Sequence, residues 1–408
     1  MSDYLRFLKE NAAFLSAGAL LTLTSSFGQT FFISIFSGEI RSAFGLSHGA
    51  WGTIYAAGTF LSAIAMIWAG QLTDVFRVRT LSFMVLPLLA AACLAMALSP
   101  AWWLLVPIVF ALRLAGQGML AHIAAVAMAR WFVATRGRAL SVASIGFALG
   151  EAILPLTFVA LLAVTGWRWL WVLAALLVLV SLVFLGRLLA LERTPRDVAT
   201  ESRSLGMESR SWTRADALQH WLFWAMVPYL LGPAAFSTAF FFHQVHFADT
   251  KAVPHLTLVS LFPIYTLSVV AVTLLSGFLI DRVGTARLMP VAQLPMVVAF
   301  LVLSAASGPI GVATGMVLMA LSVGANHTLP SAFWAEFYGT EYIGAIKAIA
   351  AAVMVLGTAI GPIVTGVLID AGAALDTQMI GIALWFLFAS AVTVLAISRA
   401  AHRLPARA

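Results

Sequence analysis

Charged residues are scarce in this chain of 408 residues, since Lys, Arg, Asp and Glu together make up only 10% of it. Soluble globular domains carry about 25% charged and about 45–50% apolar residues. Here 62% of the residues are hydrophobic, and the mean hydropathy is +1.01. So few charges cannot solvate so much apolar surface. The composition therefore excludes a soluble protein and predicts an integral membrane protein.

Cysteine is nearly absent. The one cysteine, Cys93, lies in an apolar run, which excludes a disulfide framework and a thiolate metal site. His243 and His246 lie one helical turn apart but have no third ligand nearby in the sequence, so we expect no metal. The chain also lacks a phosphate-binding loop, a zinc-protease motif and a nucleophile motif. We therefore expect neither an enzyme nor a cofactor.

Long apolar runs are what the chain has instead. A spanning helix needs about 20 mostly apolar residues, and continuous runs without the alternation of barrel strands favour helices. The first run is too long for a signal peptide and is expected to be retained. The sequence predicts an all-α integral membrane protein with twelve transmembrane helices, at about 11–37, 50–70, 80–98, 103–128, 138–164, 168–188, 219–246, 255–280, 288–306, 310–335, 344–369 and 379–398.

The positive charges orient these spans. The net charge is +7, with an isoelectric point near 10.1. All but four of the 23 Lys and Arg residues fall at the termini or in loops on one side; Arg41, Arg168 and Lys251 lie on the other side, and Arg113 lies inside a span. Because cytoplasmic loops carry the excess of Lys and Arg, we expect a multi-pass protein of the inner membrane with both termini in the cytoplasm. The basic net charge is therefore explained by the orientation of the protein in the lipid bilayer, and we expect no binding to nucleic acid.

The chain divides at its longest polar stretch. Residues 191–217 are rich in serine and carry charges of both signs, which is typical of a linker. The sequence thus predicts a six-helix bundle over 1–190, a cytoplasmic linker over 191–217 and a second six-helix bundle over 218–408. We expect a monomer.

The two halves are related by an offset of 207 residues. GQLTD begins at Gly70 and GFLID at Gly277, while LGEAILP begins at Leu149 and LGTAIGP at Leu356. Matches in separate places without a change of register predict two pseudo-symmetric bundles. Parallel repeats of six spans are typical of secondary transporters, in which the substrate binds near the midplane between the halves.

These motifs resemble the major facilitator superfamily over essentially the whole chain. The loop signature of that family, G-x-x-x-D-[RK]-x-G-[RK]-[RK], occurs in the second half with Gly277, Asp281, Arg282, Gly284 and Arg287. The first half keeps Gly70 and Asp74 but has Arg77 in place of the second glycine. The helix-four signature corresponds to Arg113-Leu-Ala-Gly116-Gln117-Gly118. The segment GTAIGPIVTGVLID is similar to a bacterial branch that carries monocarboxylates and other organic anions.

The loop signature suggests gating residues. Glycines allow helices to approach closely, and a carboxylate at a helix end can face the positive end of another helix dipole. Such contacts would hold the cytoplasmic side closed. The alternative is that these residues only orient the loop in the bilayer. The candidate gating residues are Gly70, Asp74, Arg77, Gly277, Asp281, Arg282 and, towards the outer end of its helix, His243.

Arg113 and Glu151 are the deeply placed charges. Arg113 lies roughly 16 Å from the outer end of its span at 1.5 Å per residue, where an arginine costs about 2.5–3.5 kcal/mol. We expect it to bind an anionic substrate or to control protonation of Glu151. The alternative is an Arg113–Glu151 pair that only neutralises itself. Other candidate substrate-binding residues are Gln29, Gln117, Tyr265 and Asn326.

The sequence therefore predicts a secondary transporter that moves a small solute by alternating access, with a small organic anion or monocarboxylate as substrate and H+ as the coupling ion. One departure counts against the monocarboxylate branch, because the resemblance implies a basic residue on helix eight or midway along helix eleven. Here the predicted helix 255–280 has no lysine or arginine, and Lys347 lies near the cytoplasmic end of 344–369. The alternative is a proton-driven exporter of drugs or metabolites. Its helix-five signature is incomplete, because Glu151 follows Gly146 and Gly150 where that signature has a proline.

Overall fold

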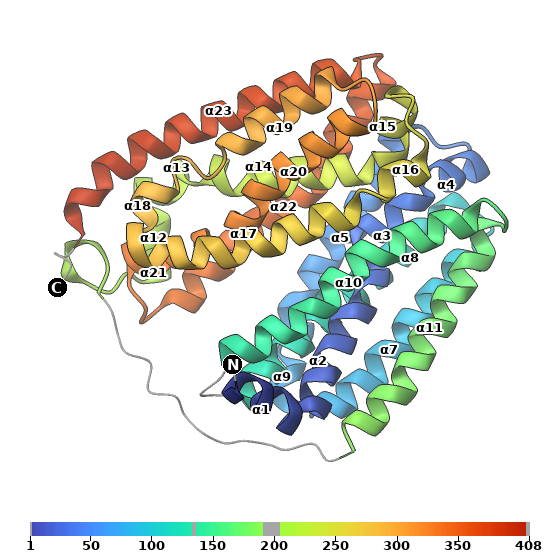
Figure 1. Ribbon diagram of the computed structural model, residues 1–408, viewed down its shortest axis with the longest axis horizontal. Helices are drawn as coiled ribbons and strands as arrows, with labels where there is room; N and C mark the ends of the chain where they lie inside the picture. Colours follow the sequence, from blue (N-terminus) through green and yellow to red (C-terminus); the bar gives the residue numbers. More distant parts are fainter. Residues whose placement is uncertain (1, 133–135, 191–204, 405–408) are drawn as a thin grey trace. The chain divides into compact units, whose positions relative to one another are not determined.

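The computed structural model describes residues 2–132, 136–190 and 205–404, without some side chains, those of Asp74 and Asp281 among them. The regular structure of the described residues is helical throughout. By its internal contacts the chain divides into two compact units, Met1–Thr200 and Glu201–Ala408. They are called the first and the second unit below, and Figure 1 shows the helices of each.

The first unit runs from blue to green in Figure 1. Its helices are α1 (Ser2–Glu10), α2 (Ala12–Ser25), η1 (Ser26–Gly28), α3 (Thr30–Ile33), η2 (Ser34–Phe36), α4 (Ser37–Phe44), α5 (His48–Ala69), α6 (Leu72–Val75), α7 (Val78–Leu98), η3 (Trp102–Leu104), α8 (Leu105–Leu112), η4 (Arg113–Leu120), α9 (Ala121–Trp131), α10 (Arg136–Leu162) and α11 (Trp167–Leu188).

The second unit begins with short helices and continues into long ones. They are η5 (Met207–Ser209), α12 (Arg214–Gln219), α13 (Trp221–Ala225), α14 (Val227–Phe242), α15 (Gln244–Thr250), α16 (His255–Val259), α17 (Phe262–Val283), α18 (Thr285–Leu288), α19 (Leu294–Ala305), α20 (Pro309–Asn326), α21 (Leu329–Tyr338), α22 (Ile343–Asp370), α23 (Leu375–Ala400) and η6 (Ala401–Arg403).

The predicted spans correspond to these helices. In the described residues ten helical segments are long and apolar enough to cross a membrane, or eleven if a bent pair counts as one span. The remaining predicted segment, 288–306, contains the shorter apolar helix α19 of 12 residues. The all-helical membrane fold is confirmed, and the count of twelve spans stays a prediction.

The first span differs from the expected continuous helix over 11–37. Its two parts, Ala12–Gly28 and Thr30–Phe44, meet at an angle of 48°. Gln29 between them is extended, with φ −86° and ψ 155°. Mean hydropathy over the span does not reveal such a break, because the polar residues beside it, Ser25, Ser26 and Thr30, lie within a long apolar run.

The same pairs of helices pack in both units. In the first unit α2 packs on α10, α7 on α11, and α5 on α8 and η4. The corresponding pairs in the second unit are α14 with α22, α19 with α23, and α17 with α20. Figure 1 shows α7 and α11 side by side over most of their length. The 207-residue repeat in the sequence is thus matched by a repeat in helix packing.

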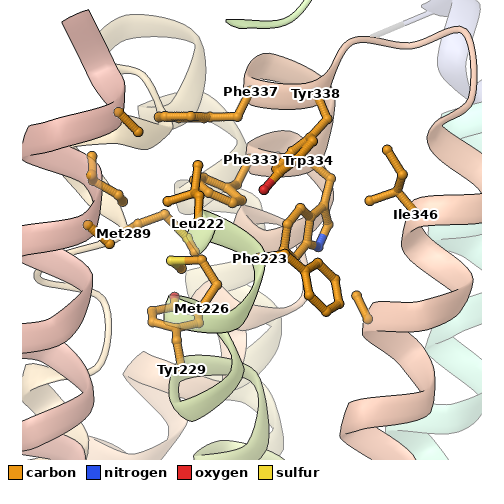
Figure 2. Packing of buried hydrophobic residues seen from close by; sticks show 14 of the residues in the cluster. Leu222, Phe223, Met226, Tyr229, Met289, Phe333, Trp334, Phe337, Tyr338 and Ile346 are labelled. Atoms are coloured by element: carbon orange, nitrogen blue, oxygen red, sulfur yellow. The ribbon is translucent and has the colours of Figure 1, made fainter. Parts of the chain in front are cut away.

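Part of the predicted linker folds onto the second unit. Met207 and Trp212 are buried in an aromatic-rich cluster with the ends of α21 and α23 and the start of α22. The Trp212 amide donates to the Tyr338 carbonyl at 3.1 Å, and its indole N–H donates to the Met207 carbonyl at 3.0 Å. Figure 2 shows the core of this cluster around Phe223, Phe333 and Trp334. Residues 191–204 of the predicted linker lie outside the described residues.

Candidate solute-binding site

The break in the first span leaves backbone polar groups in the middle of an apolar bundle. An unpaired backbone group costs several kcal/mol in a bilayer, so irregular backbone occurs there only where protein or water satisfies it. The Gln29 carbonyl accepts from the amides of Phe32 and Ile33 at 3.2 and 3.1 Å, which starts α3. The Gly28 carbonyl needs a donor from another helix.

Two glycines bring that helix into backbone contact. A Cβ atom at Gly28 would lie 2.1 Å from the Leu112 carbonyl oxygen and 2.8 Å from the Cα of Gly116. A Cβ at Gly116 would lie 2.6 Å from the Cα of Gly28. The contact lies within η4, which is wound as a π-helix. π-Helical segments are rare and occur frequently at functional sites. Here the π-helical segment η4 contacts the break in the first span, so two irregular segments meet.

Arg113 starts η4 and supplies the missing donor. Its Nη1 donates to the Gly28 carbonyl and to Thr30 Oγ1, both at 3.3 Å. Thr30 Oγ1 in turn lies 2.5 Å from the Tyr55 hydroxyl, and the guanidinium carbon lies 5.4 Å from the Tyr55 ring centroid. The side chain of Arg113 is only 2% exposed. These partners are a carbonyl, a hydroxyl and a ring, and none carries a negative charge.

Arg113 retains donor capacity. A guanidinium has five N–H donors, and among the residues that the structure describes Arg113 Nε has no hydrogen-bond partner. Glu151, the expected charge partner, does not appear among the contacts of Arg113 described above. It lies on α10, half-buried, directly after Gly150, whose added Cβ would meet Ser26 Oγ at 2.0 Å. Glu151 is therefore one residue from the contact between α10 and the break.

The structure brings some predicted binding residues together. Gln29 is the extended residue of the break and is buried, and Gln117 follows Arg113 by about one turn in η4 and is half-buried. Thr30 and Tyr55 complete this cluster, and sequence reasoning missed both. The available signal in the sequence was that Thr30 and Tyr55 place hydroxyl groups within apolar runs, but this signal does not show that their partner is Arg113.

The two candidates in the second unit lie in different settings. Tyr265 is 2% exposed and packs edge-on against Phe241 at 5.2 Å between ring centroids. Asn326 is half-buried at the end of α20, and its Nδ2 donates to the Ser322 carbonyl of the same helix at 2.9 Å. Tyr265 thus lies in an aromatic core, whereas Asn326 lies at a helix end.

The glycines of the loop signature do not both serve close helix contact. Gly70 ends α5, and an added Cβ would lie 3.6 Å from His122 Nε2, an ordinary contact. At Gly277 an added Cβ would meet nothing within 4 Å in the described residues. The expected close approach is therefore wrong for Gly277, because its open side on α17 faces no described neighbour.

The charged residues of the signature lie at helix ends. Arg77 is the exposed N-cap residue of α7, and exposed Arg282 lies 4.1 Å over the Phe278 ring. The side chains of Asp74 and Asp281, the expected gating carboxylates, lie outside the described parts of the chain. The gating hypothesis for these residues stays a prediction.

His243 lies between α14 and α15 and is buried, at 5% exposure. Its Nε2 donates to the Pro362 carbonyl of α22 at 3.0 Å. A cavity of about 20 Å³ lies beside it, lined also by Thr365 and the Phe240 ring. His243 thus lies at the end of its helix, as expected, and joins two helices inside the second unit. Its gating role stays a prediction.

The comparisons agree with this architecture. The family model of the Major Facilitator Superfamily matches residues 18–362. A bacterial homolog of the human lysosomal transporter Spinster, in an inward-facing and unoccupied conformation, aligns with a TM-score of 0.75 at 15% identity over 98% of this chain and 99% of that one. Its occupied form gives 0.72 at 15% identity over 97% and 98%.

A mutant of the nucleoside transporter NupG aligns with a TM-score of 0.69 at 12% identity, over 96% of this chain and 99% of that chain. At such identities the likeness concerns the fold alone. No curated protein sequence matches the chain.

Repeated helical units built from apolar spans define a multi-pass membrane protein. The family match covers most of the chain, and the protein belongs to the Major Facilitator Superfamily. It moves a small solute across a lipid bilayer.

Proposed function

We propose that this transporter carries a small organic anion, such as a monocarboxylate, together with protons. One observation carries the proposal: Arg113 is buried, its described partners are neutral, and its Nε lacks a partner among the described residues. An uncompensated buried charge is costly. A carboxylate that accepts from the guanidinium would neutralise it and add charge-assisted hydrogen bonds.

Glu151 is the proposed site of proton coupling. It is the acidic residue on α10 next to the contact with the break, and its carboxyl can exchange a proton as the anion binds and leaves. We further propose six-helix bundles over 1–190 and 218–408, a monomer, and an inner-membrane protein with both termini in the cytoplasm. The packing of 205–217 on the second unit indicates that the connection between bundles is shorter than 191–217.

Thermal denaturation of the purified protein tests the proposal. A ligand that binds only the folded state stabilises it by about 2.7 kcal/mol at a hundred times its Kd. We expect small carboxylates to raise the melting temperature and Arg113→Gln to abolish this rise. Arg187→Gln is the matched control, because Arg187 is exposed at the end of α11.

Two outcomes would overturn the proposal. Carboxylate stabilisation that persists in Arg113→Gln would remove Arg113 from the site. Stabilisation by lipophilic cations alone, lost in Glu151→Gln and retained in Arg113→Gln, would instead indicate the proton-driven exporter.

A further inference from the structure

The span Pro309–Tyr338 is long and apolar enough to cross a membrane as one segment, but in its middle, at a polar sequence, helix α20 gives way to helix α21. Helix α20 ends at Asn326 and α21 begins at Leu329, with His327 and Thr328 between them. At 1.5 Å per residue His327 lies about 5 Å from the middle of this span. Discontinuous helices form the substrate and ion sites of many transporters because they expose polar groups at membrane depth.

A close helix contact holds hydroxyl groups at this break. A Cβ at Gly324 would lie 2.6 Å from the Val269 carbonyl oxygen, so α20 touches the backbone of α17 here. Thr273 Oγ1 on α17 therefore reaches the Gly324 carbonyl at 3.1 Å and lies 3.4 Å from His327 Nδ1. One turn along, Ser276 Oγ lies 2.7 Å from Thr328 Oγ1.

The hydrogen bonds fix which atoms donate. Thr273 Oγ1 lies 2.8 Å from the Val269 carbonyl and 3.1 Å from the Gly324 carbonyl, and carbonyls only accept, so the single hydroxyl hydrogen is committed to them. With that hydrogen used, His327 Nδ1 makes a hydrogen bond to Thr273 Oγ1 only in the tautomer that carries the proton on Nδ1. A neutral imidazole with its proton on Nδ1 presents the Nε2 lone pair as an acceptor.

The hydroxyls at the break each have a carbonyl to donate to: Ser276 Oγ lies 2.9 Å from the Thr273 carbonyl, and Thr328 Oγ1 lies 3.4 Å from the Ala325 carbonyl. The two hydroxyls also lie 2.7 Å from each other, and either one can donate in that contact. Asn326 donates one amide N–H to the Ser322 carbonyl, which leaves its second N–H as a donor and Oδ1 as an acceptor. Within the described residues His327 Nε2 has no partner, and the His327 side chain is exposed. Ionisable side chains at such depth face water or protein and not lipid.

We propose that this break is a binding site on the second unit for a hydrogen-bond donor of the transported solute, a hydroxyl or an amine, with His327 Nε2 as the acceptor. The inference rests on the proposed function and narrows its substrate class. The solute is an organic acid that also carries a hydroxyl or amino group.

Water access to the break is tested first, without any substrate. The single native cysteine, Cys93, is buried, so wild type gives a low background with a charged thiol reagent. We expect His327→Cys to react. Leu274→Cys on α17 is the control, since Leu274 is 67% exposed and apolar as a lipid-facing residue would be, and it should stay unreactive. An unreactive His327→Cys in folded protein would overturn the proposal.

Ligand selectivity is tested next, by comparing 2-hydroxypropanoate with propanoate in binding to the full chain. One hydrogen bond contributes about 0.5–1.5 kcal/mol, so we expect the hydroxy acid to bind about two- to tenfold more tightly. His327→Phe should bind both acids equally, and His327→Gln, which keeps an acceptor, should restore part of the preference. His402→Phe is the control, because His402 is exposed and lies in η6 after the end of α23, far along the chain from the α20–α21 break.

The outcomes separate the two proposals. Equal binding of both acids by wild type, or a preference that survives His327→Phe, overturns the donor site and leaves the anion proposal standing. If neither acid binds, the anion proposal fails, and uncharged hydroxyl and amine probes decide the donor site. If the binding of those probes does not depend on His327, the donor-site proposal is overturned as well.

Discussion

At the scale of single residues, the first unit depends on a contact that only glycine permits. Gly28 and Gly116 let two irregular helical segments meet at backbone distance. That approach brings the Gly28 carbonyl within reach of Arg113. The glycine pair thus positions the cation that we place in the solute site, although neither glycine has a functional group.

Gly28→Ala should therefore destabilise the protein. The added methyl would lie 2.1 Å from a carbonyl oxygen, and the contact must open to admit it. Overpacking of this kind costs about 1–3 kcal/mol. Thermal denaturation in detergent should show the loss. Gly166→Ala should leave the melting temperature unchanged, because φ is −70° and, its chain neighbours aside, no atom of the described residues lies within 4 Å of its added Cβ.

At the scale of helices, a buried or half-buried basic side chain binds the carbonyls at the end of a corresponding helix in each unit. The basic residue comes from a different position in the two units. In the first unit Arg168 at the start of α11 donates to the Ala97 carbonyl at 2.7 Å and the Ser99 carbonyl at 2.9 Å. In the second unit Lys251 donates to the Ser304 carbonyl at 2.5 Å and lies 2.6 Å from Asp376 Oδ1. Ala97 and Ser304 are 207 residues apart, so the repeat preserves the contact and not the residue.

Lys251→Met should weaken the end of the second unit at which α23 begins. The Lys251 side chain is 4% exposed, and its removal leaves the Ser304 carbonyl and Asp376 without their charged partner. Hydrogen bonds to charged groups contribute about 1.5–3 kcal/mol, and Asp376 is 46% exposed, so we expect the low end. Lys347→Met is the control, because Lys347 is exposed. If both variants lower the melting temperature by the same amount, the proposed role of Lys251 is refuted.

The segment that docks on the second unit contains a pH-sensitive cap. His220 Nδ1 accepts from the Leu222 amide at 3.4 Å and so caps α13. Burial lowers the pKa of His220, and the positive charges of Arg403 and Arg210 lower it further, against the opposing effect of Glu208. Protonation at Nδ1 would remove the acceptor. The docked form therefore binds fewer protons than the undocked form.

Docking of 205–220 should be complete at neutral pH and weaken as the pH falls below about 6.5, the usual pKa of histidine. The sign follows from linkage, because stability falls with pH where the less ordered state binds more protons. Hydrogen exchange, expressed as protection factors, should show lower protection of this segment in acid. His220→Asn keeps an N-cap acceptor without titrating, so its protection should not change over this range. Equal acid sensitivity in His220→Asn would contradict the account.

At the scale of the whole molecule, the sequence predicted the membrane fold, the repeat and the family well. Apolar length and charge placement are local properties, and they locate spans without knowledge of their partners. Pro330 already indicates from the sequence that the helix near His327 is interrupted, and it lies in the first turn of α21. The break at Gln29 has no such local signal, and its geometry depends on packing against Gly116 of a helix far along the chain. Arg113 was found by its cost in lipid, but its partners Thr30 and Tyr55 follow from the break and so required the structure.

The central claim is that a buried arginine in the first unit binds an organic anion whose transport is coupled to protons. The most direct measurement is uptake of a labelled small carboxylate into proteoliposomes with an imposed pH gradient. We predict uptake that depends on the gradient and is lost in Arg113→Gln, while Arg187→Gln retains it and both variants remain folded. Carboxylate uptake that is unchanged in Arg113→Gln would contradict the account. So would a wild-type protein that takes up no carboxylate but moves lipophilic cations when the pH gradient is imposed.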